Sequence, residues 1–374
     1  MKILFAIKTI DGSKGGAEKV LADISSGMSV RGHHVSVLSF DNTKGRSFYD
    51  FGTKVKRIRL AVGNVLRKAT FWEVITRMRV IRKVVKRHKP DVVVAFMHSS
   101  FIPCAFALIG TGVPVIASEH IVPTHYKNRK WEFLLLICSR FFVKKITVLS
   151  NNIIQTYPTF LRDKMVPIAN PVKETRIPNT SEGEGNAQNI ILNVGRLTDQ
   201  KAQHILIEAF ALLADKYPKW VVRIVGEGEL LEDLKILTQK LNMANRIIFA
   251  GTTSNIDAEY SKANIFALPS SYESFGLATA EAMSHGVPPI GFADCPGTNE
   301  IIEHGKSGIL VEGIDSVEKY ATALESLIQS KDTRQKIGAA AKESIKKYHP
   351  ENILNEWETL IKGVVKNNTQ SSKK

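Results

Sequence analysis

The chain has 374 residues, of which 44% are hydrophobic and 8% aromatic, and it is long enough for two globular domains that each bury a core. Its three cysteines are unevenly spaced and form no C-x-x-C pair, which argues against a disulfide framework or a zinc site and favours a reducing compartment. Residues 1–175 hold 29 Lys and Arg against 11 Asp and Glu, whereas the remainder holds 22 against 25, so the first half is expected to meet an anionic partner.

The first half alternates short apolar runs with helical stretches, which predicts a parallel, doubly wound α/β sheet. Its N-terminal apolar run is too short for a signal peptide, and the longest one, 133–143, is far short of the ~20 residues of a bilayer span. We therefore expect a cytoplasmic protein without transmembrane segments. The expected strands are 3–7, 35–40, 91–96, 113–118, 146–149 and 165–168, with a helix over 17–30.

The stretch 73–89 predicts a basic amphipathic helix. Val74, Met78, Ile81 and Val85 recur at helical spacing and form one face. Basic residues form the other face. This pattern is typical of a helix at a membrane surface and equally of a packed helix with a solvated basic face. A second cluster precedes the apolar run 133–143, and we take both clusters as one surface for a membrane or a lipid-linked acceptor, with the candidate residues Arg79, Arg82, Lys83, Lys86, Arg129 and Lys130.

Two further features of the first half lie at ends of predicted strands. Gly15 and Gly16 open the first helix, where a bare backbone lets a ligand phosphate approach, although a turn needed only for chain direction fits as well. The loop is not G-x-G-x-x-G, so a dinucleotide fingerprint is absent. Glu119 and His120 end the strand 113–118, and the carboxyl end of such a strand borders the ligand site of a parallel sheet.

The second half begins after a polar stretch rich in Pro, Gly, Ser, Thr and Asn at 173–189, which indicates a linker between domains. A buried strand at 190–194 leads into a glycine followed by Arg196 and Lys201, ahead of a helix. Two cations at this spacing can bind a diphosphate, because arginine offers a planar fork of donors and lysine a point charge. After a last break at Pro350, 352–365 is expected to form a helix and 366–374 a disordered polar end.

The most informative stretch is 269–289, which places Glu273 in a strand-to-helix loop and Glu281 about one turn inside the helix. In an open parallel sheet, ligands bind beside such loops, and the helix start, near Gly276 and Leu277, presents free N–H groups and a positive dipole end. The sequence therefore predicts a site for a phosphorylated ligand here, with two carboxylates beside it.

The spacing E-x-F-G-L-x-x-x-E at 273–281 resembles the E-x7-E signature of the retaining family-four glycosyltransferases, which have the GT-B architecture. The segment 195–202 is similar to the family's G-R-x-x-x-x-K-G phosphate motif, with Ala202 in place of the last glycine. The resemblance spans essentially the whole chain and implies two Rossmann-like domains that face each other across a cleft. The implied boundaries are an acceptor-side domain at 1–172, a linker at 173–189, a nucleotide-sugar domain at 190–348, a helix crossing back to the first domain at 349–366 and a polar tail at 367–374.

The resemblance also implies roles for the candidate residues. The donor diphosphate is expected to contact Arg196, Lys201 and the N–H groups near Gly16 and Gly276–Leu277. Glu281 is expected to bind the nucleotide ribose. Glu273 and His120 are the catalytic candidates, with Glu273 positioning the hexose hydroxyls and supporting the developing positive charge, and His120 contacting the transferred hexose. No covalent nucleophile is assigned. The sequence contains no D-x-D, so we expect no metal and no cofactor, with the nucleotide sugar, favoured as a UDP-sugar, as a substrate.

The expected function is retaining transfer of a hexose or N-acetylhexosamine to a polyprenyl-diphosphate-linked saccharide in lipopolysaccharide, capsule or other surface glycan biosynthesis. The protein would then lie peripherally on the inner face of the plasma membrane. A transferase with a soluble acceptor and an epimerase of UDP-sugars stay open as alternatives. A nucleic-acid-binding protein would explain the basic first half, but it leaves the two glutamates and the cation pair without a purpose, so we expect no nucleic acid partner.

Overall fold

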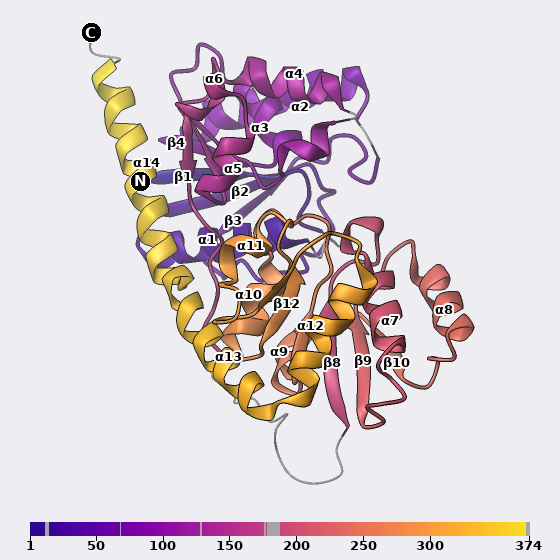
Figure 1. Ribbon diagram of the computed structural model, residues 1–374. Coiled ribbons are helices and arrows are strands. Elements are labelled where there is room, and N and C mark those ends of the chain that lie inside the picture. The colour runs from indigo at the N-terminus through magenta and orange to yellow at the C-terminus, as the bar shows by residue number, and fades with distance from the viewer. Residues whose placement is uncertain (12–14, 68, 128, 176, 178–187, 372–374) are drawn as a thin grey trace. The chain divides into compact units, whose positions relative to one another are not determined.

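The computed structural model describes residues 1–11, 15–67, 69–127, 129–175, 177 and 188–371, and the chain divides into two compact units (Figure 1). The N-terminal unit comprises Met1–Pro171 and the last helix, α14 (Pro350–Ser371), and the C-terminal unit is Val172–His349. Each unit is a parallel sheet with helices packed on it. The predicted α/β class with two doubly wound domains is therefore confirmed, as is the return of the last helix to the first domain.

The described residues of the N-terminal unit form a seven-stranded sheet in the order β3-β2-β1-β4-β5-β6-β7, with parallel pairing throughout. Every residue of the central strand β4 is buried, as expected where helices cover both faces of a sheet. The strands are β1 (Lys2–Ala6), β2 (His34–Ser39), β3 (Lys56–Arg59), β4 (Val92–Phe96), β5 (Val115–Ser118), β6 (Lys145–Val148) and β7 (Met165–Pro167).

The edge strand β3 was not predicted, because its sequence KRIR has no apolar run. Its residues Lys56 and Arg57 are exposed, and it pairs only with β2. Charged side chains are a common way to keep an edge strand from pairing with another chain. The strand therefore carries positive charge along one border of the sheet.

The helices of the N-terminal unit differ from the prediction mainly at their ends. The basic helix α2 begins two residues early because Thr70 and Glu73 form a capping box, in which the Glu73 N–H donates to Thr70 Oγ1 at 3.3 Å and the Thr70 N–H donates to Glu73 Oε2 at 2.7 Å. The described helices of this unit before α14 are α1 (Gly16–Val30), α2 (Phe71–His88), α3 (His98–Ala107), η1 (Pro123–Tyr126), α4 (Lys130–Ser139), α5 (Asn151–Thr156) and α6 (Thr159–Arg162).

The C-terminal unit has six strands among its described residues, in the order β10-β9-β8-β11-β12-β13 and again parallel. They are β8 (Asn189–Val194), β9 (Trp220–Val225), β10 (Ile247–Gly251), β11 (Ile265–Ala267), β12 (Pro289–Phe292) and β13 (Ile309–Val311). The helices are η2 (Asp199–Lys201), α7 (Gln203–Ala211), α8 (Leu231–Lys240), α9 (Ile256–Ser261), α10 (Leu277–Ser284), α11 (Thr298–Ile301), α12 (Val317–Gln329), α13 (Lys331–Ser344) and η3 (Ile345–Tyr348). Of the expected linker, 176 and 178–187 lie outside the described residues.

The last helix, α14, is longer at both ends than the sequence suggested. Pro350 opens it instead of breaking the chain, because a helix does not need the N–H of its first residue. It continues to Ser371, so the residues from 367 to 371, expected as a polar tail, are helical. It packs on α1, where Arg31 forms ion pairs with Glu351 and, at 3.0 Å, with Glu358.

The anchor of α14 is Trp357, which is 2% exposed and stacks on Phe96 of β4 with ring centroids 6.0 Å apart. We predict that Trp357→Ala lowers the free energy of unfolding of the N-terminal unit by about 3–5 kcal/mol, because it empties a core site. Asn355→Ala, at an exposed position of the same helix, should change it by less than about 0.5 kcal/mol. Urea unfolding measures both, and equal midpoints would contradict the anchoring role.

Candidate active site

Two loops of the C-terminal unit are joined by hydrogen bonds between their backbones and side chains. The loop after β8 contributes Gln200, and the loop after β11 contributes Ser271 and Tyr272. The Ser271 N–H donates to Gln200 O at 2.9 Å, and the Gln200 side-chain amide donates to Tyr272 O at 2.8 Å. These contacts fix the two loops to each other at the carboxyl ends of neighbouring strands, where the sequence predicts the ligand site.

This joint brings together two predicted site residues, Lys201 and Glu273. The Lys201 Nζ donates to Glu273 Oε1 at 2.5 Å, and the two side chains are 14% and 10% exposed. A third loop, after β12, supports the pair, since the Glu273 N–H donates to Pro296 O at 3.0 Å. Gly297 has φ +80°, and a Cβ there would lie 2.6 Å from Glu273 O, so only glycine allows this approach. The charge of each partner is compensated by the other in a largely buried place.

Arg196 lies on the same loop as Lys201 but points into solvent. Its side chain is exposed and makes no hydrogen bond or ion pair with the other described residues of its unit. Its carbonyl accepts a hydrogen bond from the Gln203 side chain at 3.0 Å, which holds the backbone of the loop. The guanidinium is therefore free to bind an anion beside Lys201.

Ala202, the departure from the family motif, keeps the loop shape that a glycine would provide. It adopts the left-handed conformation with φ +47° and ψ 41° and is 2% exposed. This conformation costs a residue with a Cβ about 1–2 kcal/mol. The replacement therefore reduces stability and leaves the position of Lys201 intact.

The helix α10 begins at Leu277, directly after Gly276, whose φ of +82° starts the turn. Glu281 lies in this helix and is half-buried, and its Oε2 accepts a hydrogen bond from the Tyr260 hydroxyl at 3.1 Å. Burial, and next the Glu281 carboxylate, raise the pKa of Tyr260 well above its usual value, so the hydroxyl stays a donor. No pattern in the sequence predicted Tyr260, because it lies on α9, 21 residues before the carboxylate that it orients.

In the N-terminal unit, His120 follows β5 as predicted and is held tightly. It is 9% exposed, its ring stacks on Phe96 at 5.0 Å, and its Nε2 lies 3.0 Å from Ser118 Oγ. Burial lowers the pKa of His120 to about 4. The imidazole is therefore neutral at neutral pH and serves as a hydrogen-bonding group.

Glu119, its neighbour, faces the protein interior and is 1% exposed. Its Oε1 accepts the backbone N–H groups of His120 and Ile121 at 2.9 and 3.1 Å, and its Oε2 accepts the Tyr126 hydroxyl at 2.6 Å. Both oxygens are thus used within the protein, so Glu119 positions the loop that carries His120. Burial raises the pKa of Glu119 to about 7.

The remaining candidates of the N-terminal unit have mixed surroundings. Gly15 caps α1, and a Cβ there would lie 2.3 Å from Glu18 Oε2, so an acidic side chain covers the start of this helix. Residues 12–14 of the same loop lie outside the described residues.

Within the described part of the chain, no helix is both long and apolar enough to cross a membrane, and no three His, Cys, Asp or Glu residues are grouped as metal ligands would be.

The basic candidates on α2 and α4 are not equivalent. Arg79, Lys83, Lys86 and Lys130 are exposed, and exposed Arg129 lies 3.3 Å from Glu132. Arg82 differs from them, because its guanidinium donates to Ala107 O and Ile109 O at 2.7 Å each. It therefore satisfies carbonyl groups at the end of α3. The helical pattern of charges did not predict this structural role.

The raised pKa of Glu119 makes a prediction about pH. The folded state binds a proton that the unfolded state releases between the usual pKa of 4.5 and about 7. The contribution of Glu119 to stability is thus complete below pH 4.5 and lost as the pH rises through 7. Glu119→Gln should remove this dependence, so that the variant gains on the order of 3 kcal/mol relative to the wild type between pH 4.5 and 8. Urea unfolding at several pH values measures it, and parallel pH profiles would contradict it.

Comparison with known proteins gives matches along the whole chain. The family model "Glycosyltransferase Family 4" matches residues 14–176, and the model "Glycosyl transferases group 1" matches residues 178–344. An uncharacterized glycosyltransferase of Haemophilus influenzae is 27% identical over 361 residues, which are 96% of this chain and 99% of that protein.

A second relative, from Campylobacter jejuni, has a printed activity. It is the GalNAc-alpha-(1->4)-GalNAc-alpha-(1->3)-diNAcBac-PP-undecaprenol alpha-1,4-N-acetyl-D-galactosaminyltransferase, 28% identical over 96% of this chain and 98% of its own length. Among solved structures, Anabaena HepE in complex with UDP and glucose has a TM-score of 0.77 at 22% identity and covers 96% of this chain and 99% of its own. The two family models together span most of the sequence, and this chain belongs to the family-four glycosyltransferases with GT-B architecture.

Proposed function

We propose that this glycosyltransferase moves a hexose or an N-acetylhexosamine, with retention, from a UDP-sugar to a polyprenyl-diphosphate-linked saccharide in surface glycan biosynthesis. The observation that carries the proposal is the buried Lys201–Glu273 pair with the unpaired Arg196 beside it. Two comparisons support the finer points. The Campylobacter jejuni relative is named for an undecaprenol-linked acceptor, and Anabaena HepE binds UDP and glucose.

The departing diphosphate is the charge that the site has to stabilise. Arg196 supplies a positive charge, Lys201 supplies ammonium N–H donors although Glu273 compensates its charge, and the N–H groups at the start of α10 add dipoles that need no rearrangement during the reaction. Glu281, oriented by Tyr260, accepts hydrogen bonds from the nucleotide ribose. Each of these groups comes from the C-terminal unit, so this unit is the donor-binding one.

Glu273 then acts on the sugar instead of on the diphosphate. Its Oε1 is held by Lys201, which leaves Oε2 for a hexose hydroxyl and for the positive charge that develops on the ring. A carboxylate held in an ion pair is a poor nucleophile, which supports attack on the front face of the donor. The acceptor proton then goes to the leaving phosphate.

For His120 of the N-terminal unit we propose contact with the transferred hexose as a neutral donor or acceptor, since burial lowers its pKa to about 4 and leaves the ring uncharged at neutral pH. Two cations five positions apart can take over the role of a metal ion, so we propose that the reaction needs no divalent ion. Activity in the presence of EDTA tests this point directly.

The N-terminal unit has the features of a surface that rests on a membrane. Large apolar side chains are exposed around α2 and α4, both of which pack against α3 (Figure 1). Exposed lysines and arginines accompany them on the same helices. Aromatic rings at the headgroup level and cations beside anionic lipids are the usual means of peripheral binding. We name this set the apolar–basic surface: Leu66, Phe71, Trp72, Trp131, Phe141, Arg79, Lys83, Lys86, Arg129 and Lys130.

The Lys201–Glu273 ion pair allows a prediction about activity. Lys201→Ala and Glu273→Ala should each reduce sugar transfer by about 100-fold or more, because each removes a group that stabilises charge in the transition state. Lys240→Ala, an exposed lysine of the same unit, should leave transfer unchanged. UDP release from a panel of UDP-sugars with EDTA and lipid extract measures it, with circular dichroism to confirm folding. Transfer at wild-type rates in a folded Lys201→Ala or Glu273→Ala protein would overturn the assignment.

A further prediction concerns the apolar–basic surface. Trp72 and Trp131 are 73% and 79% exposed, so replacing both with serine removes apolar area without emptying a core. The Trp72→Ser/Trp131→Ser protein should bind phosphatidylglycerol vesicles at least about tenfold more weakly. Hydrolysis of the donor in water should persist.

Ile236→Ser, at an exposed apolar position of the C-terminal unit, is the control. If all three proteins sediment equally with vesicles, the surface does not bind the membrane. Turnover of a donor without stimulation by lipid would then favour a soluble acceptor, and conversion of the UDP-sugar without any acceptor would favour an epimerase.

A further inference from the structure

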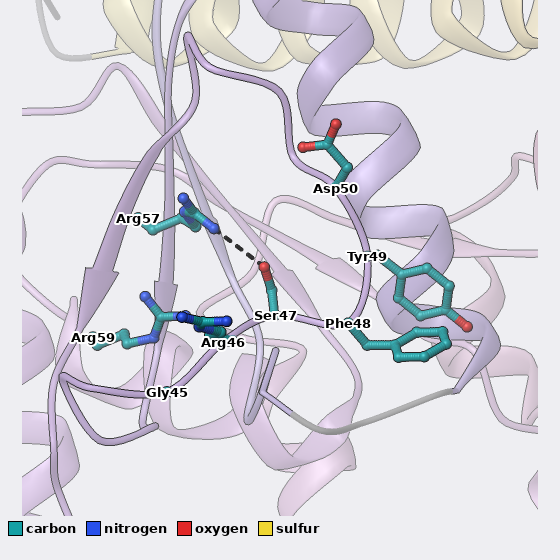
Figure 2. Close-up of a pocket in the computed structure, with 8 residues that line it drawn as sticks. All are labelled: Gly45, Arg46, Ser47, Phe48, Tyr49, Asp50, Arg57 and Arg59. Atoms are coloured by element: carbon teal, nitrogen blue, oxygen red, sulfur yellow. Dashed lines mark hydrogen bonds between the residues drawn. The ribbon is translucent and has the colours of Figure 1, made fainter. Parts of the chain in front are cut away.

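A hollow of about 420 Å³ lies in the N-terminal unit between the loop after β2 and the edge strand β3 (Figure 2). Three arginines line it together with two aromatic residues and a serine, and none of these was a candidate from the sequence. Its volume falls within the range of about 300–1,000 Å³ that small-molecule sites occupy. The lining residues are Gly45, Arg46, Ser47, Phe48, Tyr49, Asp50, Arg57 and Arg59.

The wall of the hollow is fixed by Asp11. Arg59 donates to both carboxylate oxygens of Asp11, from Nε at 3.1 Å and from a terminal nitrogen at 2.6 Å. The backbone of Asp11 also pairs with that of Ser47 as an antiparallel bridge. A Cβ on Gly45 would lie 1.7 Å from Asp11 Oδ2, so the loop needs a glycine to lie this close to the carboxylate. The site is thus built around a fixed ion pair.

The other two arginines retain donors for a ligand. Arg57 is exposed, and one of its terminal nitrogens donates to Ser47 Oγ at 3.2 Å, which orients the side chain. Arg46 is exposed and makes no hydrogen bond or ion pair with the described residues. Figure 2 shows the arginines gathered on one side of the loop. Asp50 lies away from them, and its carboxylate accepts the Gly52 N–H at 2.8 Å.

The surrounding charge favours an anion. Between positions 41 and 60 the chain has six Lys or Arg and two Asp. One of the acids, Asp41, is buried and already accepts the Thr9 hydroxyl at 2.5 Å and the Ile10 N–H at 2.7 Å. Positive groups around a hollow raise the local concentration of anions. The ligand is therefore expected to carry negative charge.

The aromatic pair gives the second half of the chemistry. Phe48 and Tyr49 pack edge to face with centroids 5.0 Å apart, and Phe48 is 47% exposed. Aromatic side chains beside a few fixed polar groups are typical of sites that take a ring-containing ligand. A sugar ring offers C–H groups to such a surface, while its phosphate meets the arginines.

We propose that this hollow binds the phosphate group of a sugar phosphate, and that the ligand is the phosphorylated end of the glycosyl acceptor. Guanidinium groups suit the task because they make paired, charge-assisted hydrogen bonds to phosphate oxygens. The identity of the ligand as the acceptor rests on the proposed function. The presence of a phosphate site does not.

The test uses N-acetylglucosamine 1-phosphate as the probe and calorimetry to measure its affinity for the full chain. Arg46→Ala/Arg57→Ala should bind the probe at least about tenfold more weakly than the wild type, since it loses charged donors to an anion. Lys54→Ala, an exposed lysine of the same segment outside the hollow, should bind as the wild type does. N-acetylglucosamine without phosphate should bind weakly to all three proteins. Equal affinities of the three for the probe would overturn the proposal.

Two further arms separate other sources of the signal. Saturating UDP should leave probe binding intact, and its complete loss would assign the probe to the donor site and overturn the proposal. Phosphatidylglycerol vesicles should bind Arg46→Ala/Arg57→Ala and the wild type equally. If vesicle binding falls while probe binding persists, the arginines contact lipid headgroups and the proposal is wrong.

The proposed function has its own readouts, which are stabilisation by UDP and release of UDP during transfer. Failure of those with probe binding intact would remove the acceptor interpretation and leave the phosphate site. If transfer occurs, Arg46→Ala/Arg57→Ala should raise the KM for the lipid-linked acceptor at least about tenfold, with unchanged donor hydrolysis. An unchanged acceptor KM would show that the hollow does not take the acceptor.

Discussion

The buried ion pair between Lys201 and Glu273 is the constraint on which the C-terminal unit depends. Two charges with little access to water stay there only because each compensates the other and because three loops hold them in place. The same loops bring Arg196 and the start of α10 to one edge of the sheet. A phosphate bound there, as proposed above, would meet cations whose positions were set when the protein folded, which is how a site lowers the reorganisation needed during a reaction.

The candidate site of the C-terminal unit was easier to recognise in the sequence, because its residues lie at short spacings along the chain. Glu273, Gly276 and Glu281 lie within nine positions, and Arg196 and Lys201 share one loop, so local spacing was enough to name them all as candidates. Tyr260 was not predicted, because Glu281, which accepts its hydrogen bond, is distant in sequence. Arg82 and Arg79 share the helical spacing and the charge of the basic face of α2, so the sequence did not distinguish them. The difference is that Arg82 donates to carbonyl groups at the end of α3. Tertiary contacts of this kind leave no local pattern.

In the N-terminal unit, by contrast, positive charge lies along an edge of the sheet. The strand β3 carries Lys56, Arg57 and Arg59, and its lack of an apolar run hid both the strand and the hollow beside it. In the interior of the same unit, burial lowers the pKa of His120 to about 4 and so keeps its ring uncharged. Neutral groups inside and cations outside would suit the phosphate-bearing acceptor proposed above, because the core stays free of unpaired charge while the surface attracts anions.

The return of α14 has a consequence for how the protein is made. The chain of the N-terminal unit is interrupted by the whole of Val172–His349, and its core is completed by Trp357 and Ile361, which leave the ribosome only after that whole segment. Domains usually fold in the order of synthesis. Here the C-terminal unit emerges complete first, while Phe96 still lacks the ring that covers it. The sheet of the N-terminal unit therefore waits in an unfinished form, and its exposed core makes this interval the time at which a nascent chain most needs a chaperone.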